Sequence, residues 1–201
     1  MAQGFPLGRE RHPAWHALRP VAYRPVAMPA AARPRRRQSP KLAGALPEAR
    51  PGEVVIWTDG ACQGNPGPGG WAAILADDSG AVVAERSGGL PATTNNIMEM
   101  TAALEGLRAL PDDARAVVVT DSRYLHDGMT SWLAGWKKRG WRTAGGDPVK
   151  NQELWQALEA EAGRLAQVRW HWVRGHVGTE LNERADQLAV AAAAEAAGRA
   201  G

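Results

Sequence analysis

The sequence predicts an α/β fold in which helices flank a mixed five-stranded sheet. Residues 54–86 contain short apolar runs separated by turn signals, which is typical of an antiparallel meander. Residues 116–120 form a compact β-branched run between two helical patterns, which indicates a buried parallel strand reached by a crossover. A further apolar run at 168–174 precedes an Ala-rich helical pattern. Antiparallel strands followed by strands that alternate with helices make one mixed sheet.

The first fifty residues differ from the rest of the chain. They contain ten Lys or Arg residues and two acids, a net charge of +8, whereas residues 51–201 contain 14 basic and 19 acidic residues, a net charge of −5. Pro, Arg and Ala dominate residues 1–50 without hydrophobic periodicity. This composition predicts a disordered basic tail at 1–50 and a folded domain at 51–201. The basic balance of the whole chain therefore says nothing about the folded surface.

The same tail bears on location. It lacks the apolar segment of a secretory signal, and its nine prolines before Gly52 and its single serine, Ser39, argue against the amphipathic helix of an organelle transit peptide. No apolar run approaches the ~18 residues that span a bilayer. The single cysteine, Cys62, fits a reducing compartment. We therefore expect a cytoplasmic protein without a membrane partner. Three interpretations of the tail stay open. It is a solvated segment, a functional arm, or the product of a start codon assigned too far upstream, in which case translation would begin at Met28.

Three short strands are expected first, over residues 54–58, 71–76 and 81–86. The sequence Asp77-Asp78-Ser79-Gly80 supplies a turn between the second and the third, and a glycine-rich run supplies one between the first and the second. These short connections favour antiparallel pairing.

A helix capped by Thr94 or Asn95 is expected next, because its apolar residues recur on one helical face at Ile97, Met100, Leu104 and Leu107. After the buried parallel strand, short helices lead into a basic, Trp-rich segment at 132–150. A helix at 151–165 and the last strand follow. The final helix is expected at 179–197, with Thr179 as its N-cap.

Four acidic residues stand in particular local contexts. They are Asp59 in T-D-G-A-C-Q-G-N-P-G-P-G-G, Glu99 in T-N-N-I-M-E, Asp121 in V-V-T-D-S and Asp186 in G-H-V-G-T-E-L-N-E-R-A-D. Asp59 is expected to end the first strand and Asp121 the buried parallel strand, where open sheets place their ligand crevices. Alone, each of these two is more often a turn residue or a helix N-cap than a catalyst. Together, the carboxylates are what Mg²⁺ needs, because it is held by carboxylate oxygens, water and substrate phosphates.

Helical geometry places the other two acids. Glu99 shares a helix face with Ala103 and Gly106, whose small side chains would let that face approach the sheet. The alternative is an ordinary first-turn glutamate favoured by the helix dipole. Asp186 is one turn from Asn182, so both side chains can point at one substrate or metal.

His176 lies in a loop between Gly175 and Gly178, after the last strand. A lone histidine in a loop is usually just solvated. Ten residues before Asp186, however, it is placed to shuttle protons at the expected metal site.

These motifs resemble those of bacterial ribonuclease H of type 1, over roughly residues 52–193. The resemblance implies the ribonuclease H-like fold and a catalytic domain that hydrolyses the RNA strand of RNA–DNA hybrids as an endonuclease, leaving 5′-phosphate and 3′-hydroxyl ends. It implies two Mg²⁺ ions bound with substrate, with Mn²⁺ as a substitute, and a two-metal mechanism. The metal ligands would be Asp59, Glu99, Asp121 and Asp186. His176 would be an auxiliary catalyst for proton transfer or product release.

Such an enzyme must sense 2′-hydroxyl groups on one strand only. The resemblance implies minor-groove contacts to the two strands from Cys62, Asn65, Asn95 and Asn96. Amide side chains suit this role because each offers donors and an acceptor. The glycine-rich run at 64–70 would bring main-chain N–H groups close to the substrate, and a plain hairpin loop is the alternative.

A second substrate-binding region is expected where indoles alternate with basic side chains, at Trp132, Trp136, Lys137, Lys138, Arg139, Trp141 and Arg142. This segment resembles the basic protrusion that grips the DNA strand in many bacterial ribonucleases H. Some of the tryptophans must instead be core, because an indole buries too much apolar area to be left exposed. The sequence departs from the family at Arg123 and Asp127, where relatives usually carry glutamines, and at Ile97, where several have arginine.

Two other functions compete with this prediction. A catalytically silent nucleic-acid-binding module on the same fold should have lost at least one of the four carboxylates, and all are present. A transposase or resolvase relative would lack both the N-N-x-M-E segment and the Trp-rich basic protrusion. We therefore expect a monomeric enzyme whose partner is the RNA–DNA hybrid.

Overall fold

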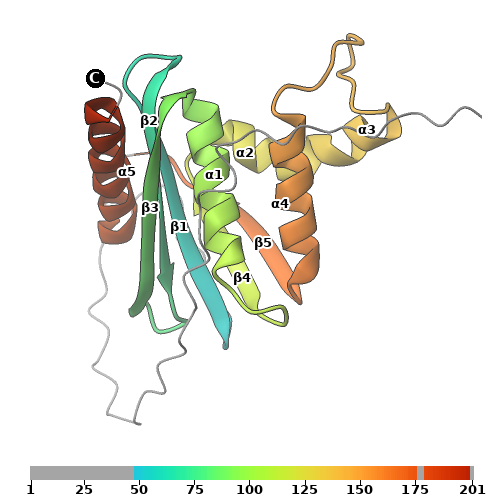
Figure 1. Cartoon of the computed structure of the whole chain (residues 1–201). Coiled ribbons are helices and arrows are strands. Elements are labelled where there is room, and N and C mark those ends of the chain that lie inside the picture. Colours follow the sequence, from blue (N-terminus) through green and yellow to red (C-terminus); the bar gives the residue numbers. More distant parts are fainter. Residues whose placement is uncertain (1–47, 176–178, 200–201) are drawn as a thin grey trace, which may run out of the picture.

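The computed structural model describes residues 48–175 and 179–199, which form a five-stranded sheet with helices on both of its faces (Figure 1). The strands are β1 (Glu53–Cys62), β2 (Gly67–Ala76), β3 (Val82–Thr93), β4 (Arg115–Thr120) and β5 (Gln167–Trp172). The helices are α1 (Asn95–Arg108), α2 (Arg123–Asp127), the π-helix η2 (Gly128–Trp132), α3 (Leu133–Lys138), α4 (Gln152–Arg164) and α5 (Glu180–Gly198).

The sheet is mixed, as the sequence predicts. Its strand order is β3-β2-β1-β4-β5. The β1–β2 and β2–β3 pairs are antiparallel, whereas the β1–β4 and β4–β5 pairs are parallel. The fold class is therefore confirmed, although β1 and β3 run further than the predicted strands, to Cys62 and Thr93.

Each face of the sheet has its own core, because successive strand residues point to opposite sides. Ile56 and Val118 belong to the core beneath α1 and α4, whereas Trp57 and Val119 belong to the core beneath α5. Burial on both faces explains why β1 and β4 read as continuous apolar runs rather than alternating ones.

Helix α1 lies close against β1, as the small residues on its inner face predict. A Cβ atom added at Gly106 would lie 2.5 Å from Cγ2 of Ile56, so no larger residue fits there without a shift. Thr94 is the N-cap, and its hydroxyl accepts a hydrogen bond from the Ile97 N–H. All residues from Met98 to Leu107 are buried, so α1 is a central helix and not a one-sided surface helix.

The glycine-rich run has a different role from the one the sequence predicts. The expectation that all of residues 64–70 form a substrate-facing turn is wrong for its second half, because β2 already begins at Gly67. A Cβ atom at Gly70 would lie 2.2 Å from the carbonyl oxygen of Ala189 in α5. Gly70 therefore makes room for the backbone of the Ala-rich helix, and only residues 63–66 connect the two strands.

The predicted tail lies almost wholly outside the described residues. Glu48, Ala49 and Arg50 are described, and they contact the domain. Nη2 of Arg169 donates to the Glu48 carbonyl oxygen at 3.2 Å, and Ala49 packs against the core beneath α5. Glu48 and Ala49 therefore lie against the folded domain.

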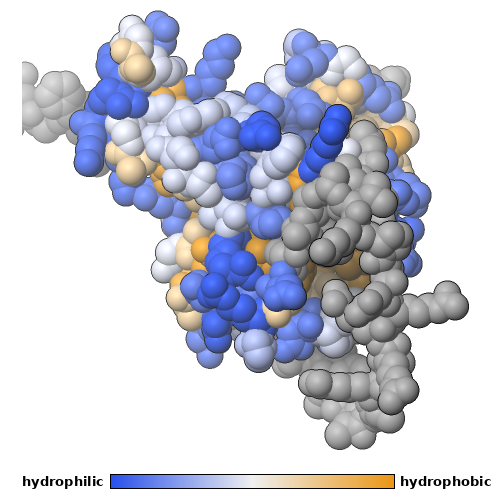
Figure 2. All heavy atoms as spheres, turned by 180° about the vertical axis from the view of Figure 1, so that it is seen from behind, coloured by the Kyte–Doolittle hydropathy of each residue, from blue (hydrophilic) through white to orange (hydrophobic). Residues whose placement is uncertain are grey.

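The surface is mostly polar on the side opposite to that of Figure 1. Where grey atoms do not cover it, Figure 2 shows hydrophilic and intermediate residues with small hydrophobic areas between them. Among the helices of residues 48–175 and 179–199, none has the length and apolar character needed to cross a bilayer.

One ion pair ties the outer strand β5 to the start of β1. Glu53 is 1% exposed, and Arg169 donates to both of its carboxylate oxygens, from Nε at 2.8 Å and from Nη2 at 2.6 Å. These hydrogen bonds lower the pKa of Glu53 to about 2, against the opposing effect of burial. The pair therefore stabilises the fold only while Glu53 is ionised.

We predict that Arg169→Met lowers the free energy of unfolding by about 1–3 kcal/mol at neutral pH, because it removes both guanidinium donors from a buried carboxylate that then keeps only the Arg50 N–H. A carboxyl whose folded pKa is depressed contributes stability above its unfolded pKa and loses it as the pH falls through the folded value. The deficit should therefore shrink between pH ~4.5 and ~2 in urea titrations. Arg184→Met is the control, because Arg184 pairs with Glu85 on the exposed surface and should contribute little. Equal losses for both variants would contradict the prediction.

Candidate active site

Three carboxylates from separate elements meet at one end of the sheet. Oxygen atoms of Asp59, Glu99 and Asp121 all lie within 4.8 Å of one another. Asp59 comes from β1, Glu99 from the first turns of α1, and Asp121 from the residue after β4. The structure therefore brings together three of the four acids that the sequence singles out.

The parallel pairing of β1 with β4 explains where two of them lie. This pairing ends at Trp57 and Val119, beyond which β1 pairs only with β2. Asp121 follows β4 directly, as predicted. Asp59 does not end its strand, as the sequence suggests, but lies within β1 opposite Ala72. Both acids nevertheless lie past the last parallel pair, on the edge where ligand crevices of such sheets form.

Helix α1 delivers Glu99 by passing directly over β1. A Cβ atom at Gly60 would lie 2.4 Å from the backbone nitrogen of Glu99, so only glycine allows this approach. Gly60 therefore makes room for the start of α1, which carries Glu99 to the cluster.

Asp121 is held through its main chain. Nε1 of Trp172 donates to the Asp121 carbonyl oxygen at 2.9 Å, and Trp172 lies beside Thr120 in the parallel β4–β5 pairing. A Cβ atom at Gly175 would lie 2.6 Å from Oδ2 of Asp121, so the chain after β5 also begins against this carboxylate. Sequence reasoning missed Trp172, because nothing in its local sequence separates it from the other tryptophans.

Burial and mutual repulsion raise the pKa values of the cluster. Burial is the largest cause for Asp59, followed by the charge of Asp121, and together with Asp186 they raise its pKa to about 7 although the Gly60 N–H opposes the shift. Burial, then the charges of Asp59 and Asp121, raises the pKa of Glu99 well above its ordinary value. The folded protein thus confines negative charge that a bound cation would neutralise.

The donor set fits a hard divalent cation. Oε2 of Glu99 is buried without a hydrogen-bond partner in the described part of the chain, while Oε1 accepts a 3.5 Å hydrogen bond from Asn95. A buried acceptor that lacks a donor is costly. Mg²⁺ and Mn²⁺ bind carboxylate oxygens, so either ion would satisfy this atom.

The remaining predicted site residues are Asp186, Asn182 and His176. Asp186 lies outside the 4.8 Å group, although its interaction with Asp59 contributes to the raised pKa of that residue. Asn182, one turn earlier in α5, is 6% exposed. His176 lies outside the described residues.

The expected minor-groove residues are neighbours in space. The Asn95 N–H donates to Oδ1 of Asn65 at 3.4 Å, and Sγ of Cys62 donates to the carbonyl oxygen of Thr93 at 3.6 Å. Asn95 in turn donates to Glu99, and Asn96 is exposed. These residues therefore form one surface that adjoins the acidic cluster, and their substrate contacts stay a prediction.

The basic segment of residues 132–142 is built on buried indoles. Trp136 is 9% exposed and packs between Trp132 and Trp155 at centroid distances of 5.6 and 5.4 Å. It supports the segment from beneath, which confirms that part of the tryptophan content is core. Trp132 is 38% exposed, so its indole is the one that remains open to a ligand. Trp141 is half-buried and packs against the core.

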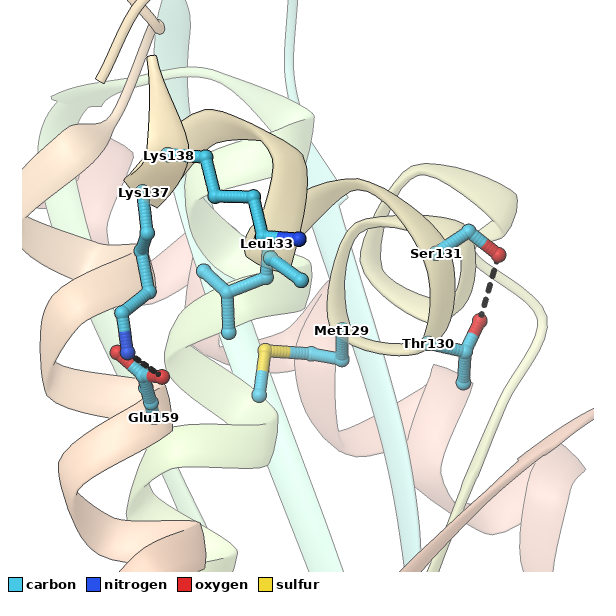
Figure 3. A pocket seen from close by; sticks show the side chains of 8 residues that line it. Met129, Thr130, Ser131, Leu133, Lys137, Lys138 and Glu159 are labelled. Atoms are coloured by element: carbon cyan, nitrogen blue, oxygen red, sulfur yellow. Dashed lines mark hydrogen bonds and ion pairs between the residues drawn. The ribbon is translucent and has the colours of Figure 1, made fainter. Parts of the chain in front are cut away.

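A pocket of about 370 Å³ lies beside this segment and is partly lined by it (Figure 3). Met129 and Leu133 line it, and Nζ of Lys137 reaches Oε1 of Glu159 across its rim at 2.6 Å. None of the clustered acids lines it. Lys138 and Arg139 are exposed, and Nε of Arg139 donates to the carbonyl oxygen of Arg142. The basic side chains without a carboxylate partner in this part of the described chain are thus Lys138, Arg139 and Arg142.

Known proteins resemble this chain over most of its described length. The family model for RNase H matches residues 51–194. A ribonuclease H of Bordetella bronchiseptica is 55% identical over 147 residues, which are 73% of this chain and 93% of that protein. A ribonuclease H of Chelativorans sp. is 57% identical over 136 residues, 68% of this chain and 82% of that protein.

Solved structures give the same result. LC9-RNase H1, described as a type 1 RNase H with the type 2 active-site motif, has a TM-score of 0.63 and 36% identity over 74% of this chain and 75% of its own. LC11-RNase H1, solved in complex with RNA/DNA hybrid, has a TM-score of 0.57 and 25% identity over 72% of this chain and 99% of its own.

We predict that Asp59→Asn stabilises the metal-free protein in a pH-dependent way. Asp59 keeps its proton to about pH 7 when folded, whereas the unfolded chain releases it near pH 3.8. Folding therefore takes up a proton between these values, and the free energy of unfolding of the wild-type chain falls as the pH rises through them. The variant escapes this loss and should exceed the wild type by roughly 2–4 kcal/mol at pH ~8 and by little at pH ~4.

Urea unfolding with a chelator present measures this difference. Asp113→Asn is the matched control, because Asp113 is exposed in the connection between α1 and β4. Its curve should run parallel to that of the wild type. A gain by Asp59→Asn that is the same at both pH values would show that the cost of ionising Asp59 in the folded protein is not the cause.

Proposed function

The chain belongs to the ribonuclease H family, and on that premise we propose that it hydrolyses the RNA strand of RNA–DNA hybrids as an endonuclease with two divalent metal ions. The observation that supports this function most directly is the gathering of Asp59, Glu99 and Asp121 within 4.8 Å, with one buried Glu99 oxygen left without a partner. A catalytically silent module would have no need to maintain this repulsive arrangement.

The proposed metal ligands are Asp59, Glu99, Asp121 and Asp186. When bound, Mg²⁺ would supply Lewis acidity at the scissile phosphate and neutralise charge that develops on the leaving oxygen. Mn²⁺ is a plausible substitute because it accepts the same oxygen ligands. Attack by water in line with the leaving 3′-oxygen leaves a 5′-phosphate and a 3′-hydroxyl.

The chain's own groups would orient the reaction. The tether from Trp172 fixes the main chain of Asp121, and the close packing at Gly60 fixes the start of α1 and with it Glu99. A rigid ligand set keeps its geometry without reorganising as the reaction proceeds. His176 is proposed to move a proton or to help release the product, since it follows Gly175, which lies against Asp121.

Substrate selection is proposed to use two surfaces. Cys62, Asn65, Asn95 and Asn96 would line the minor groove, where the 2′-hydroxyl distinguishes RNA from DNA. The basic segment would bind phosphates of the DNA strand through its exposed cations. The structure of LC11-RNase H1 with RNA/DNA hybrid supports the choice of substrate class for this chain.

The wider setting is also a proposal. A single free cysteine suits a reducing compartment, which supports a cytoplasmic location. We propose that the catalytic unit, residues 51–201, acts as a monomer, because each proposed ligand comes from one chain.

Asp59→Asn should abolish cleavage while the fold and hybrid binding persist, because an amide cannot supply the missing negative charge. Labelled RNA–DNA, RNA–RNA and DNA–DNA duplexes incubated with and without Mg²⁺ measure this. Wild type should cut only the hybrid and only with the metal, and the variant should be slower by on the order of 10³-fold or more. Asp113→Asn should match the wild type. Near-normal turnover by Asp59→Asn would exclude the proposed metal site.

Lys138→Gln with Arg139→Gln should weaken hybrid binding and flatten its salt dependence. Each lost phosphate contact removes about 0.9 from the slope of log K against log salt, so the pair should remove roughly 1.8. The control replaces Arg184 in α5 and Arg199, the residue that follows α5, and Figure 1 shows this helix on the opposite side of the molecule from α3. If both double variants shift the slope equally, the basic segment is not a specific contact.

A further inference from the structure

A guanidinium group is stacked on an indole beside the acidic cluster. Cζ of Arg123 lies 3.8 Å from the centroid of the Trp172 ring. The same indole donates its N–H to the Asp121 carbonyl oxygen at 2.9 Å. One tryptophan therefore holds both the main chain of a proposed metal ligand and a cation two residues further along.

The stack leaves the binding edges of Arg123 free. Arg123 is exposed, and in the described part of the chain no carboxylate lies within ion-pair distance of it. Other arginines in that part do pair with acids, namely Arg86, Arg108, Arg164, Arg169, Arg184 and Arg199. The indole covers one flat face of the guanidinium, whereas the N–H donors lie in its plane and point away from the ring.

This arrangement is suited to a phosphate. A guanidinium offers two parallel N–H donors that match two phosphate oxygens. Because the ring already restricts the Arg123 side chain, binding would cost less conformational entropy than it would for a free arginine. A cation without an acidic partner is also the group that a polyanion would meet first beside a cluster of carboxylates.

Position decides which strand would be bound. Under the proposed function, on which this inference rests, the metal site that includes Asp121 would receive the scissile phosphate, and that phosphate belongs to the RNA strand. Arg123 opens α2 two residues after Asp121, and the same indole contacts both residues, so the guanidinium and the acid are held next to each other. We propose that Arg123, held by Trp172, binds an RNA-strand phosphate next to the scissile one and thereby positions that strand.

Equilibrium binding of a labelled RNA–DNA hybrid to the full chain, without divalent cations and across a salt series, tests the contact. Arg123→Gln should raise Kd about 10-fold and reduce the salt slope by about 0.9. Arg115→Gln is the matched control, because Arg115 is an exposed arginine at the other end of β4 and should change neither quantity. Arg123→Lys should keep most of the slope but lose part of the affinity, because it keeps the charge without the fork.

A Trp172 pair separates stacking from tethering. Trp172→Phe keeps a ring for the guanidinium and should preserve the salt slope, although it loses the hydrogen bond to Asp121. Trp172→Leu removes the ring and should lower the slope as Arg123→Gln does. If Arg123→Gln lowers the melting temperature but binds hybrid as Arg115→Gln does, the stack is only a structural clasp and the proposal is overturned.

Replacing single phosphates of the hybrid with uncharged linkages identifies the phosphate that Arg123 contacts. A 2′-deoxy methylphosphonate is placed at successive RNA positions, with the 2′-deoxy linkage alone as the reference, and methylphosphonates are placed likewise in the DNA strand. Wild type should lose affinity at an RNA position where Arg123→Gln loses none. Coupling to a DNA-strand position instead would overturn the assignment of strand.

The two proposals fail separately. If wild type binds hybrid with the expected dependence on Arg123 but no duplex is cut with Mg²⁺, the contact stands and the proposed function is wrong. If wild type cuts the hybrid and Arg123→Gln resembles Arg115→Gln in binding, the function stands and the contact is wrong.

Discussion

The burial of carboxylates that also repel one another is the constraint that the rest of this structure must support. Asp59, Glu99 and Asp121 are held within 4.8 Å of one another, and burial together with their mutual charge raises the pKa of Asp59 to about 7. Such a cluster opposes folding in the absence of a cation. The fold must therefore supply enough packing energy elsewhere to keep the three side chains in place.

That support comes from close packing on both sides of the sheet. Glycine at position 60 admits the start of α1, and Gly70 admits the backbone of α5. On the β5 side, Trp172 anchors Asp121, and Arg169 ties β5 to the start of β1 through Glu53. Each contact restrains either an element that carries one of the four acids or a strand that neighbours such an element. Main-chain packing thus takes a direct part in positioning the cluster.

Net charge is a poor guide to how this molecule would meet nucleic acid. Residues 51–201 carry a net charge of −5, yet exposed cations stand on the surfaces that we propose bind the duplex. Lys138 and Arg139 project from a segment built on buried indoles, and Arg123 is stacked on Trp172 beside the acids. Local arrangement therefore outweighs total charge, because phosphate contacts act over short distances at physiological salt.

The sequence by itself determined the fold class and picked out the three acids that the structure brings together, because apolar periodicity follows strand and helix geometry and each acid stands in a distinctive local pattern. It also predicted the close face of α1 from Ala103 and Gly106. Only the tertiary structure decided that Gly70 seats α5, that Trp136 is core, and that Trp172 joins Asp121 to Arg123. These contacts join residues of separate elements, often far apart along the chain. No local pattern encodes which elements come to lie against each other at atomic distance.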